Sequence, residues 1–398
     1  ILKTAPIMKY NFDTIIDRNN TDAIKQEALL TRWGRNDLIP LWVADMDLAT
    51  PPFIMEVLQK RCQHPILGYT SKPDSYYSAI INWLKKRYNW SIERKSISYT
   101  PGIVPGLAFA IKCFTSPKDK ILVMPPVYHP FFLVTENENR KVVFCPLILK
   151  DGQYQIDFEQ FEKQIKGCKV FILCNPHNPG GRVWNMEELK RIASICAQNN
   201  VLVFSDEIHA DLTFPPYQHI PFATVSKEAA DNSLVFMSPS KAFNMAGLAS
   251  SFCIIKNEFL REKFKKFTEG SDLTEGHVFA FRSVEAAYTY GEEWLSQVLE
   301  YLQENVIYTE QYLKEKMPRI KAIIPQASFL IFLDCRELCL SQKDLVDFFV
   351  DKAHLALNDG SMFGKEGEGF MRMNIACPRA ILNRALNQLE KAYHEKFE

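Results

Sequence analysis

The sequence predicts an α/β fold in which a mainly parallel sheet lies between layers of helices. Short apolar runs recur along the middle of the chain, each closed by Pro, Asp, Asn or Ser, as is typical of buried strands. They cover residues 120–126, 141–147, 169–176, 201–207, 233–238 and 250–256. Amphipathic segments separate them, and in one of these Asn185 and Glu188 match a capping box. Such alternation is typical of helices packed on a parallel sheet.

The C-terminal third follows another pattern. One long helical pattern runs from Glu292 to Met317 and ends at Pro318. Two strand-like segments, ASFLIFLDC and GFMRMNIAC, then precede a closing helix that has Pro378 near its first turn. We therefore expect a large domain at 49–290 and a smaller α+β domain at 291–398. The first 48 residues carry no βαβ pattern and are expected to pack on the small domain.

Composition restricts the partners. The 398 residues are 47% hydrophobic, enough for a substantial core, and 47 basic residues balance 47 acidic ones. Without a polybasic block, neither nucleic acid nor an anionic membrane is an expected partner, which leaves small molecules. No window has the length of an apolar membrane span.

The cysteines and the N-terminus bear on location. The ten cysteines include no CxxC pair, which indicates reduced core thiols rather than disulfides or a metal site, and hence a cytoplasmic protein. The N-terminal apolar stretch is too short for a signal peptide. Met8 is a candidate native start, with the preceding residues either added or part of a longer gene.

Chemically active residues follow the strand-like runs. In an open α/β sheet, ligands bind beyond the carboxyl ends of the strands. After these runs come PPVYHPF, CNPHNPGGRVW, DEIHADL and SPSKAFNMAGL. A tyrosine, an amide, an acid, a histidine and a lysine are thereby expected at one sheet edge: Tyr128, Asn178, Asp206, His209 and Lys241.

The lysine suggests a cofactor with an aldehyde. At a buried sheet edge Lys241 loses hydration, so its pKa falls and the neutral amine can form a Schiff base. Ser238 and Ser240 offer hydroxyl groups to a phosphate. The amides of Ile103 and Val104, at the start of an apolar helix, offer N–H groups to the same phosphate. An aldehyde, a phosphate and a ring nitrogen occur together in pyridoxal 5'-phosphate.

The other requirements of pyridoxal phosphate are also matched. Its ring nitrogen needs a buried carboxylate to stay protonated, which Asp206 can supply. Asn178 and His209 are placed to hold the phenolate oxygen. Tyr128 is the candidate aromatic platform for the ring.

The motifs as a set carry a resemblance to a known family. They are LIPLWVADMD, GYT at 68–70, YTPGIVPGL, PPVYHPF, LCNPHNPGGRVW, SDEIHADL, SPSKAFNMAGL and MRMNIACPR, and they cover nearly the whole chain in order. The chain resembles the fold-type I pyridoxal-phosphate enzymes of the aminotransferase class I/II superfamily. Within it, the chain is similar to the MalY/PatB-like branch of cystathionine β-lyases, or C–S lyases. This resemblance implies a seven-stranded, mainly parallel sheet and a homodimer.

The resemblance also implies roles for single residues. Lys241 would bind the cofactor covalently and then act as general base at the substrate Cα, and Arg372 would bind the substrate α-carboxylate. Tyr69 would reach the phosphate from the other subunit. Two positions depart from many aminotransferases: His209 replaces a tyrosine, as in the lyase branch, and Ala249 replaces a phosphate-binding arginine. The partner subunit or a helix end must then compensate for the missing charge.

The reaction implied is cleavage of L-cystathionine or a related cysteine S-conjugate into a thiol, pyruvate and ammonia. No residue in the sequence excludes transamination, so an aminotransferase of unknown specificity is an alternative. A third hypothesis is of another class. Members of this branch bind and restrain a transcriptional activator, so a regulatory role is also open.

Overall fold

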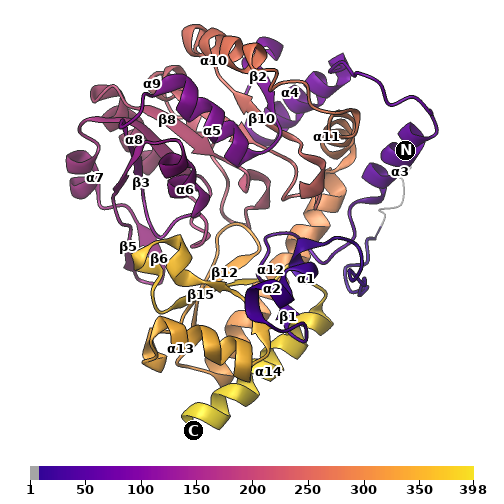
Figure 1. Ribbon diagram of the computed structural model, residues 1–398, viewed down its shortest axis with the longest axis vertical. Helices are drawn as coiled ribbons and strands as arrows, with labels where there is room; N and C mark the ends of the chain where they lie inside the picture. The colour runs from indigo at the N-terminus through magenta and orange to yellow at the C-terminus, as the bar shows by residue number, and fades with distance from the viewer. Residues whose placement is uncertain (1–8) are drawn as a thin grey trace, which may run out of the picture.

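A seven-stranded sheet forms the centre of the structure, a computed structural model that describes residues 9–398 (Figure 1). Across the sheet the strands are β2 (Ile97–Thr100), β10 (Ser251–Ile254), β9 (Ser233–Met237), β8 (Leu202–Asp206), β7 (Cys168–Cys174), β3 (Lys120–Val123) and β4 (Lys141–Phe144). Only β10 runs antiparallel to its neighbours. All six apolar runs are confirmed as strands. Met8 lies outside the described residues.

Helices cover both faces of this sheet, as predicted. On one face α5 (Ile103–Phe114), α6 (Pro130–Asn137) and α10 (Glu258–Gly270) pack in one apolar cluster. On the other lie α7 (Phe158–Gln164), α8 (Met186–Gln198) and α9 (Lys227–Asp231). Alternate β3 residues contribute to the two clusters, Ile121 to the first and Leu122 to the second. The capping box is confirmed, since Asn185 and Glu188 exchange side-chain and backbone hydrogen bonds at the start of α8.

A second group of helices lies beside the β2 end. It contains α3 (Pro52–Cys62), α4 (Asp74–Tyr88) and α11 (Val278–Tyr290), and α11 packs against both of the others. Away from this group, β5 (Ile148–Lys150) and β6 (Gln153–Gln155) form a hairpin. The connection between α3 and α4 runs along the outer edge of the molecule (Figure 1).

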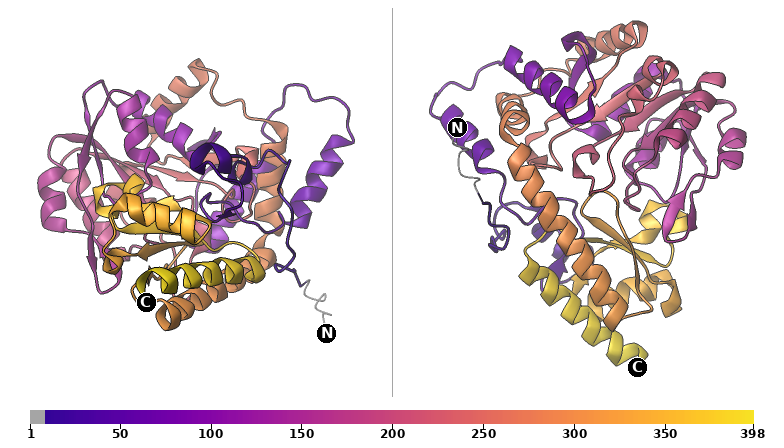
Figure 2. Two further views of the ribbon diagram at one scale, coloured as in Figure 1. Left: turned by 60° about the horizontal axis from the view of Figure 1, so that its bottom comes forward. Right: turned by 180° about the vertical axis from the view of Figure 1, so that it is seen from behind.

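The C-terminal third forms a separate, four-stranded antiparallel sheet. Its strands, in order, are β11 (Lys321–Ile323), β12 (Leu330–Asp334), β15 (Phe370–Asn374) and β14 (Asn358–Asp359). The long helix α12 (Glu292–Lys316) and the closing helix α14 (Arg379–Phe397) lie side by side, while α13 (Gln342–Asp347) packs nearby (Figure 2). The two strands and two helices expected here are confirmed. Within residues 9–398, no helix has the length and hydrophobicity needed to span a bilayer.

The N-terminal segment reaches across to the small sheet region. After α1 (Ile24–Glu27) and α2 (Leu29–Trp33), strand β1 (Ile39–Pro40) pairs in parallel with β13 (Leu355–Ala356). A small apolar cluster joins Leu29, Leu38 and Trp42 to Val350 and Ala356. The domain boundaries at 48/49 and 290/291 stay a prediction; the latter falls at Gly291, between α11 and α12.

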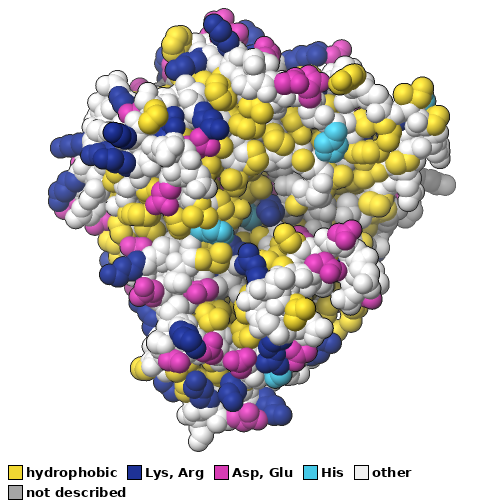
Figure 3. Space-filling view, viewed as in Figure 1, with side chains coloured by type: hydrophobic (Ala, Val, Ile, Leu, Met, Phe, Trp, Pro, Cys, Tyr) yellow, Lys and Arg dark blue, Asp and Glu magenta, His cyan; other side chains and the backbone are white. Residues whose placement is uncertain are grey.

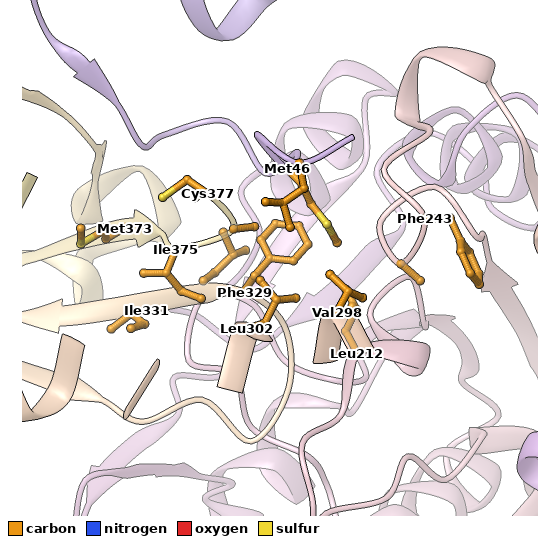
Figure 4. Packing of buried hydrophobic residues seen from close by; sticks show 14 of the residues in the cluster. Met46, Leu212, Phe243, Val298, Leu302, Phe329, Ile331, Met373, Ile375 and Cys377 are labelled. Carbon is orange, nitrogen blue, oxygen red and sulfur yellow. The ribbon is translucent and has the colours of Figure 1, made fainter. Parts of the chain in front are cut away.

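One apolar cluster joins these parts. Figure 4 shows Met46 of the N-terminal segment, Phe243, Leu302 of α12, Phe329 and Ile375 packed in a single region. These side chains come from segments far apart in the sequence, so the core is continuous across the parts of the chain. All ten cysteines are free thiols and most are buried, as predicted, although Cys62 and Cys339 are exposed.

Gly181 fixes the turn that follows β7. Its φ is +66°, and its N–H donates to the carbonyl of His177 at 2.8 Å. Its own carbonyl accepts from the N–H groups of Gln326 and Ala327 at 2.8 and 3.1 Å. A Cβ at this position would lie 2.6 Å from the Cα of Pro325, so only glycine fits.

We therefore expect Gly181→Ala to lower the free energy of unfolding by clearly more than Gly34→Ala does. Gly34 has a similar φ of +69° with nothing within 4 Å of an added Cβ, so its substitution costs only backbone strain, about 1 kcal/mol. The clash at Gly181 adds roughly 1–3 kcal/mol. Thermal unfolding of the two variants measures the difference, and equal melting temperatures would contradict the close approach.

Candidate active site

A pocket lies at the carboxyl edge of the large sheet. Eight of the predicted site residues line it: Ile103, Val104, Tyr128, Asn178, Asp206, His209, Ser240 and Lys241. The space-filling view shows a hollow near the middle of this face, where basic and histidine side chains reach the surface (Figure 3). The strand-end rule therefore brings these residues together in space, as expected from the sequence.

Lys241 lies just beyond the end of β9 and projects into the pocket. Its Nζ donates a hydrogen bond to the carbonyl of Ala44 at 2.6 Å. Burial lowers the pKa of Lys241 to about 8, with a further decrease from Arg372, while Asp45 and Asp206 act in the opposite direction. Near neutral pH a useful fraction of this amine is therefore uncharged.

Asp206 ends strand β8 and is almost fully buried. One carboxylate oxygen accepts the N–H of Ile208 at 3.1 Å. Burial raises the pKa of Asp206 to about 7, and neither this hydrogen bond nor the charge of Lys241 offsets it. Such a carboxylate is suited to a ligand that brings its own proton or positive charge.

Asn178 and His209 face the same space. The Oδ1 of Asn178 accepts from Nη1 of Arg372 at 3.1 Å. The Nδ1 of His209 is buried and has no hydrogen-bond partner. Burial, with the charges of Lys241 and Arg372, lowers the pKa of His209 to about 3, so its ring is neutral. An unpaired polar atom in a buried ring indicates a missing ligand group.

Tyr128 lies beside these residues, between β3 and α6. Its backbone N–H donates to the carbonyl of Asn178 at 3.0 Å, which fixes its position in the pocket wall. Burial raises the pKa of Tyr128 to about 12, so the phenol stays neutral. A neutral aromatic ring in the wall is suited to stacking on a flat ligand.

The far end of the pocket is suited to an anion. Helix α5 begins there at Ile103 and has no side-chain cap, so the amides of Ile103 and Val104 are available. Ser240 also lines the pocket. Ser238 does not; its hydroxyl instead accepts the N–H of Ser240 at 3.2 Å and organises the turn.

Sequence reasoning missed the hydroxyl of Ser250. Ser250 lines the pocket, and its Oγ is buried without a partner. The sequence does contain a signal for this residue, because Ser250 is the first residue of the apolar run that becomes β10. It was missed because the strand-end rule considers residues that follow a strand, and Ser250 precedes one. Since β10 runs antiparallel to its neighbours, its beginning lies at the same edge as their ends.

Arg372 comes from β15 of the small sheet. Its guanidinium donates to Asn178, to Asn358 Oδ1 at 2.6 Å and to the carbonyl of Trp42 at 3.1 Å, and its Nε is buried and unpaired. Burial lowers the pKa of Arg372 to about 10. All its partners within the described residues are neutral, so its charge is available to a carboxylate.

Tyr69 lies apart from this pocket. It sits on the connection between α3 and α4 and is fully exposed, with 106% relative accessibility. Within residues 9–398 it does not line the pocket of its own chain. Ala249 does line the pocket. Among the pocket-lining residues of the described chain, Lys241 is the one Lys or Arg.

The chain belongs to the family described as Aminotransferase class I and II, whose pattern it matches over residues 36–389. It is 39% identical to "Cystathionine beta-lyase PatB" of Bacillus subtilis, covering 96% of this chain and 99% of that protein. The crystal structure of cystalysin from Treponema denticola, which contains pyridoxal 5'-phosphate, superposes with a TM-score of 0.94 at 35% identity, covering 98% and 100% of the two chains. A pyridoxal-phosphate-bound C–S lyase from Staphylococcus hominis gives 0.90 at 34% identity, covering 97% and 98%.

The raised pKa of Asp206 gives a pH-dependent prediction for the protein without a ligand. Its carboxyl holds a proton to about pH 7 when folded, but only to about pH 4 when unfolded. The free energy of unfolding therefore falls as pH rises between these values. We expect Asp206→Asn to gain roughly 2–3 kcal/mol relative to wild type between about pH 5 and pH 8.

Urea unfolding at several pH values tests this difference. Asp272→Asn is the control, because Asp272 is exposed and its substitution should give no pH-dependent gain. A stability difference between Asp206→Asn and wild type that stays constant across this pH range would show that Asp206 is already ionised in the folded protein.

Proposed function

We propose that this protein is a pyridoxal-phosphate-dependent C–S β-lyase. It cleaves L-cystathionine or a related cysteine S-conjugate to a thiol, pyruvate and ammonia. The observation that carries the proposal is the meeting, in one pocket, of an amine with a lowered pKa and a buried carboxylate with a raised pKa. The C–S lyase and cystathionine β-lyase names of the relatives support the reaction, and their bound cofactor supports the cofactor.

The pocket fits the ring of the cofactor. Asp206 would pair with the protonated ring nitrogen, which explains a buried carboxylate that lacks a basic hydrogen-bond partner within the described chain. The unpaired Nδ1 of His209 and the amide of Asn178 would hold the phenolic oxygen. Tyr128 would lie against the ring face.

The other end of the pocket fits a phosphate. Ile103, Val104, Ser240 and Ser250 all line the pocket, and their amides and hydroxyls would bind the phosphate. Because Ala249 provides no positive charge, the N-terminus of α5 carries more of the binding. The contact of Ser238 with the phosphate stays a prediction, since its hydroxyl accepts the N–H of Ser240 and keeps its own O–H as a donor.

Catalysis requires removal of the substrate Cα proton. When bound, pyridoxal phosphate acidifies this proton, because its ring accepts the electron pair that the proton leaves behind. Arg372 would bind the α-carboxylate through its charge and its unpaired Nε and so place Cα near Lys241. The neutral amine of Lys241 takes the proton, which its pKa of about 8 permits near neutral pH. Loss of thiolate from Cβ then completes the elimination, and water hydrolyses the released 2-aminoacrylate to pyruvate and ammonia.

We also infer a cytoplasmic homodimer in which Tyr69 serves the partner's site. Tyr69 is fully exposed, and Ile66 and Leu67 beside it are exposed apolar side chains, which favours burial against a second copy. The phenol would supply a hydrogen bond to the phosphate, where Ala249 supplies none. The free thiols support a reducing compartment.

The proposed reaction predicts sustained pyruvate release from L-cystathionine by the purified protein without any keto acid. Lys241→Ala should lower kcat/KM by roughly a thousandfold or more, since it removes the proton acceptor. A lactate dehydrogenase-coupled assay measures the pyruvate. Turnover only after addition of 2-oxoglutarate or pyruvate would make the protein an aminotransferase instead.

Mixed dimers test the place of Tyr69. Tyr69→Ala and Lys241→Ala should each be nearly inactive alone, whereas a hybrid of the two contains one site with both native residues. Equal mixing should therefore restore about one quarter of the wild-type activity per chain. Differently tagged copies isolate the hybrid. A hybrid with no more activity than its parents would place Tyr69 outside the partner's site.

A further inference from the structure

The Lys241 amine binds a backbone carbonyl whose two neighbouring carbonyls are themselves fixed by hydrogen bonds. Ala44 accepts from Lys241 Nζ at 2.6 Å. The carbonyls of its neighbours, Val43 and Asp45, both accept from the side-chain amide of Asn374, at 2.5 and 2.6 Å. The Ala44 carbonyl is therefore fixed in direction by a residue of the small sheet.

Asn244, which lies on the side of the large sheet, holds the next part of the same segment by hydrogen bonds to its backbone. Its Nδ2 donates to the carbonyls of Met46 and Leu48 at 3.0 and 2.7 Å, and its Oδ1 accepts the N–H of Met46 at 3.0 Å. Asn244 lies only three residues after Lys241. The segment and the catalytic lysine are thus anchored to the same turn.

Four charged side chains brace this segment, and we call them the N-terminal ion cluster: Arg18, Lys25, Asp45 and Asp47. Arg18 binds both carboxylates at 2.7 Å. Lys25 is fully buried, with its Nζ 2.8 Å from Asp47 and 3.3 Å from Asp45. The two positive and two negative charges balance.

Stability alone does not account for a fully buried lysine in such a cluster. Desolvation of buried ions consumes most of their mutual attraction, so an apolar replacement is often as stable. The cluster lies directly beside the residue whose carbonyl meets Lys241. Its negative member Asp45 raises the pKa of Lys241, against the lowering by burial, and its positive member Lys25 lowers that pKa.

We propose that the N-terminal ion cluster positions Lys241 for proton transfer. It fixes the Ala44 carbonyl as the docking point of the amine whenever the amine is not bonded to the cofactor, and it places Asp45 near the ammonium that forms. The inference rests on the proposed role of Lys241 as the base. Ala44 accepts an N–H, so the nitrogen lone pair points elsewhere and is free to take the Cα proton, while the electron pair stays on the substrate.

Charges from every surrounding part of the chain act on this amine. The charged groups that act on Lys241 are Asp45 and Lys25 of the N-terminal segment, Asp206 of the large sheet and Arg372 of the small sheet. The other titratable side chains in its pocket are His209, Tyr128 and Cys174. Only Asp45 and Lys25 lie in the ion cluster and outside the cofactor pocket. They can therefore be changed without removing a pocket residue.

Two substitutions should shift the pH at which the Lys241 amine is half-protonated, in opposite directions. Asp45→Asn removes a negative charge and should lower the pH at which the amine is half-protonated, by roughly one unit. Lys25→Met removes a positive charge and should raise that pH. The rate at which an amine-reactive reagent labels Lys241, followed by peptide mass spectrometry against pH, measures both in the full-length protein freed of cofactor.

Asp47→Asn is the matched control. It removes the same charge from the same cluster, but it is Asp45 that follows Ala44 directly in the sequence and raises the pKa of Lys241. We expect Asp47→Asn to lower the melting temperature about as much as Asp45→Asn does, but to shift the labelling midpoint of Lys241 clearly less. Midpoints that move in the same direction for Asp45→Asn and Lys25→Met, or that do not move, would overturn the positioning role.

The holoenzyme separates this inference from the proposed function. The pH at which kcat for L-cystathionine rises to half its maximum should follow the labelling midpoint across the variants. If the labelling midpoints of Asp45→Asn and Lys25→Met shift in opposite directions but the wild-type enzyme releases no pyruvate, the lyase reaction is rejected while the positioning of Lys241 stands. Normal pyruvate release with unchanged midpoints would reject the positioning alone.

Discussion

The short segment from Trp42 to Ala44 is the constraint on which the site depends. Its carbonyl groups accept from Arg372 of the small sheet and from Lys241 of the large sheet, only two residues apart. Covalent geometry limits how far apart two carbonyls of so short a segment can lie, so the guanidinium and the amine that bind them are held near each other. In the proposed function, a substrate whose carboxylate binds Arg372 would thereby have its Cα directed toward Lys241.

Among the residues of the pocket, burial has a larger effect on the pKa values of Lys241 and Asp206 than any nearby charge. Desolvation lowers the pKa of Lys241 and raises that of Asp206, so the two values move toward each other and toward neutrality. Arg372 keeps its charge with neutral partners only. Each group is thus ready for a partner that the protein does not supply: a proton, a protonated ring or a carboxylate.

Two neutral residues mark how this chain departs from many aminotransferases. Ala249 leaves the phosphate end without an arginine, and His209 is neutral because of its burial. In the proposed function, the first turn of α5 and the serine hydroxyls would then carry the phosphate binding. A less positive pocket also leaves Lys241 with fewer cations nearby, which keeps its pKa from falling further.

The sequence by itself determined the large sheet and the residues at its edge, because buried strands leave local apolar patterns and parallel strands end together. It missed β2, whose four residues ISYT carry no apolar run, and Ser250, which precedes an antiparallel strand. Only the tertiary structure revealed the Ala44 carbonyl, the ion cluster around Lys25 and the turn-forming role of Ser238. Ala44 and Lys241 are 197 positions apart, and a contact of that range leaves no periodicity in either segment.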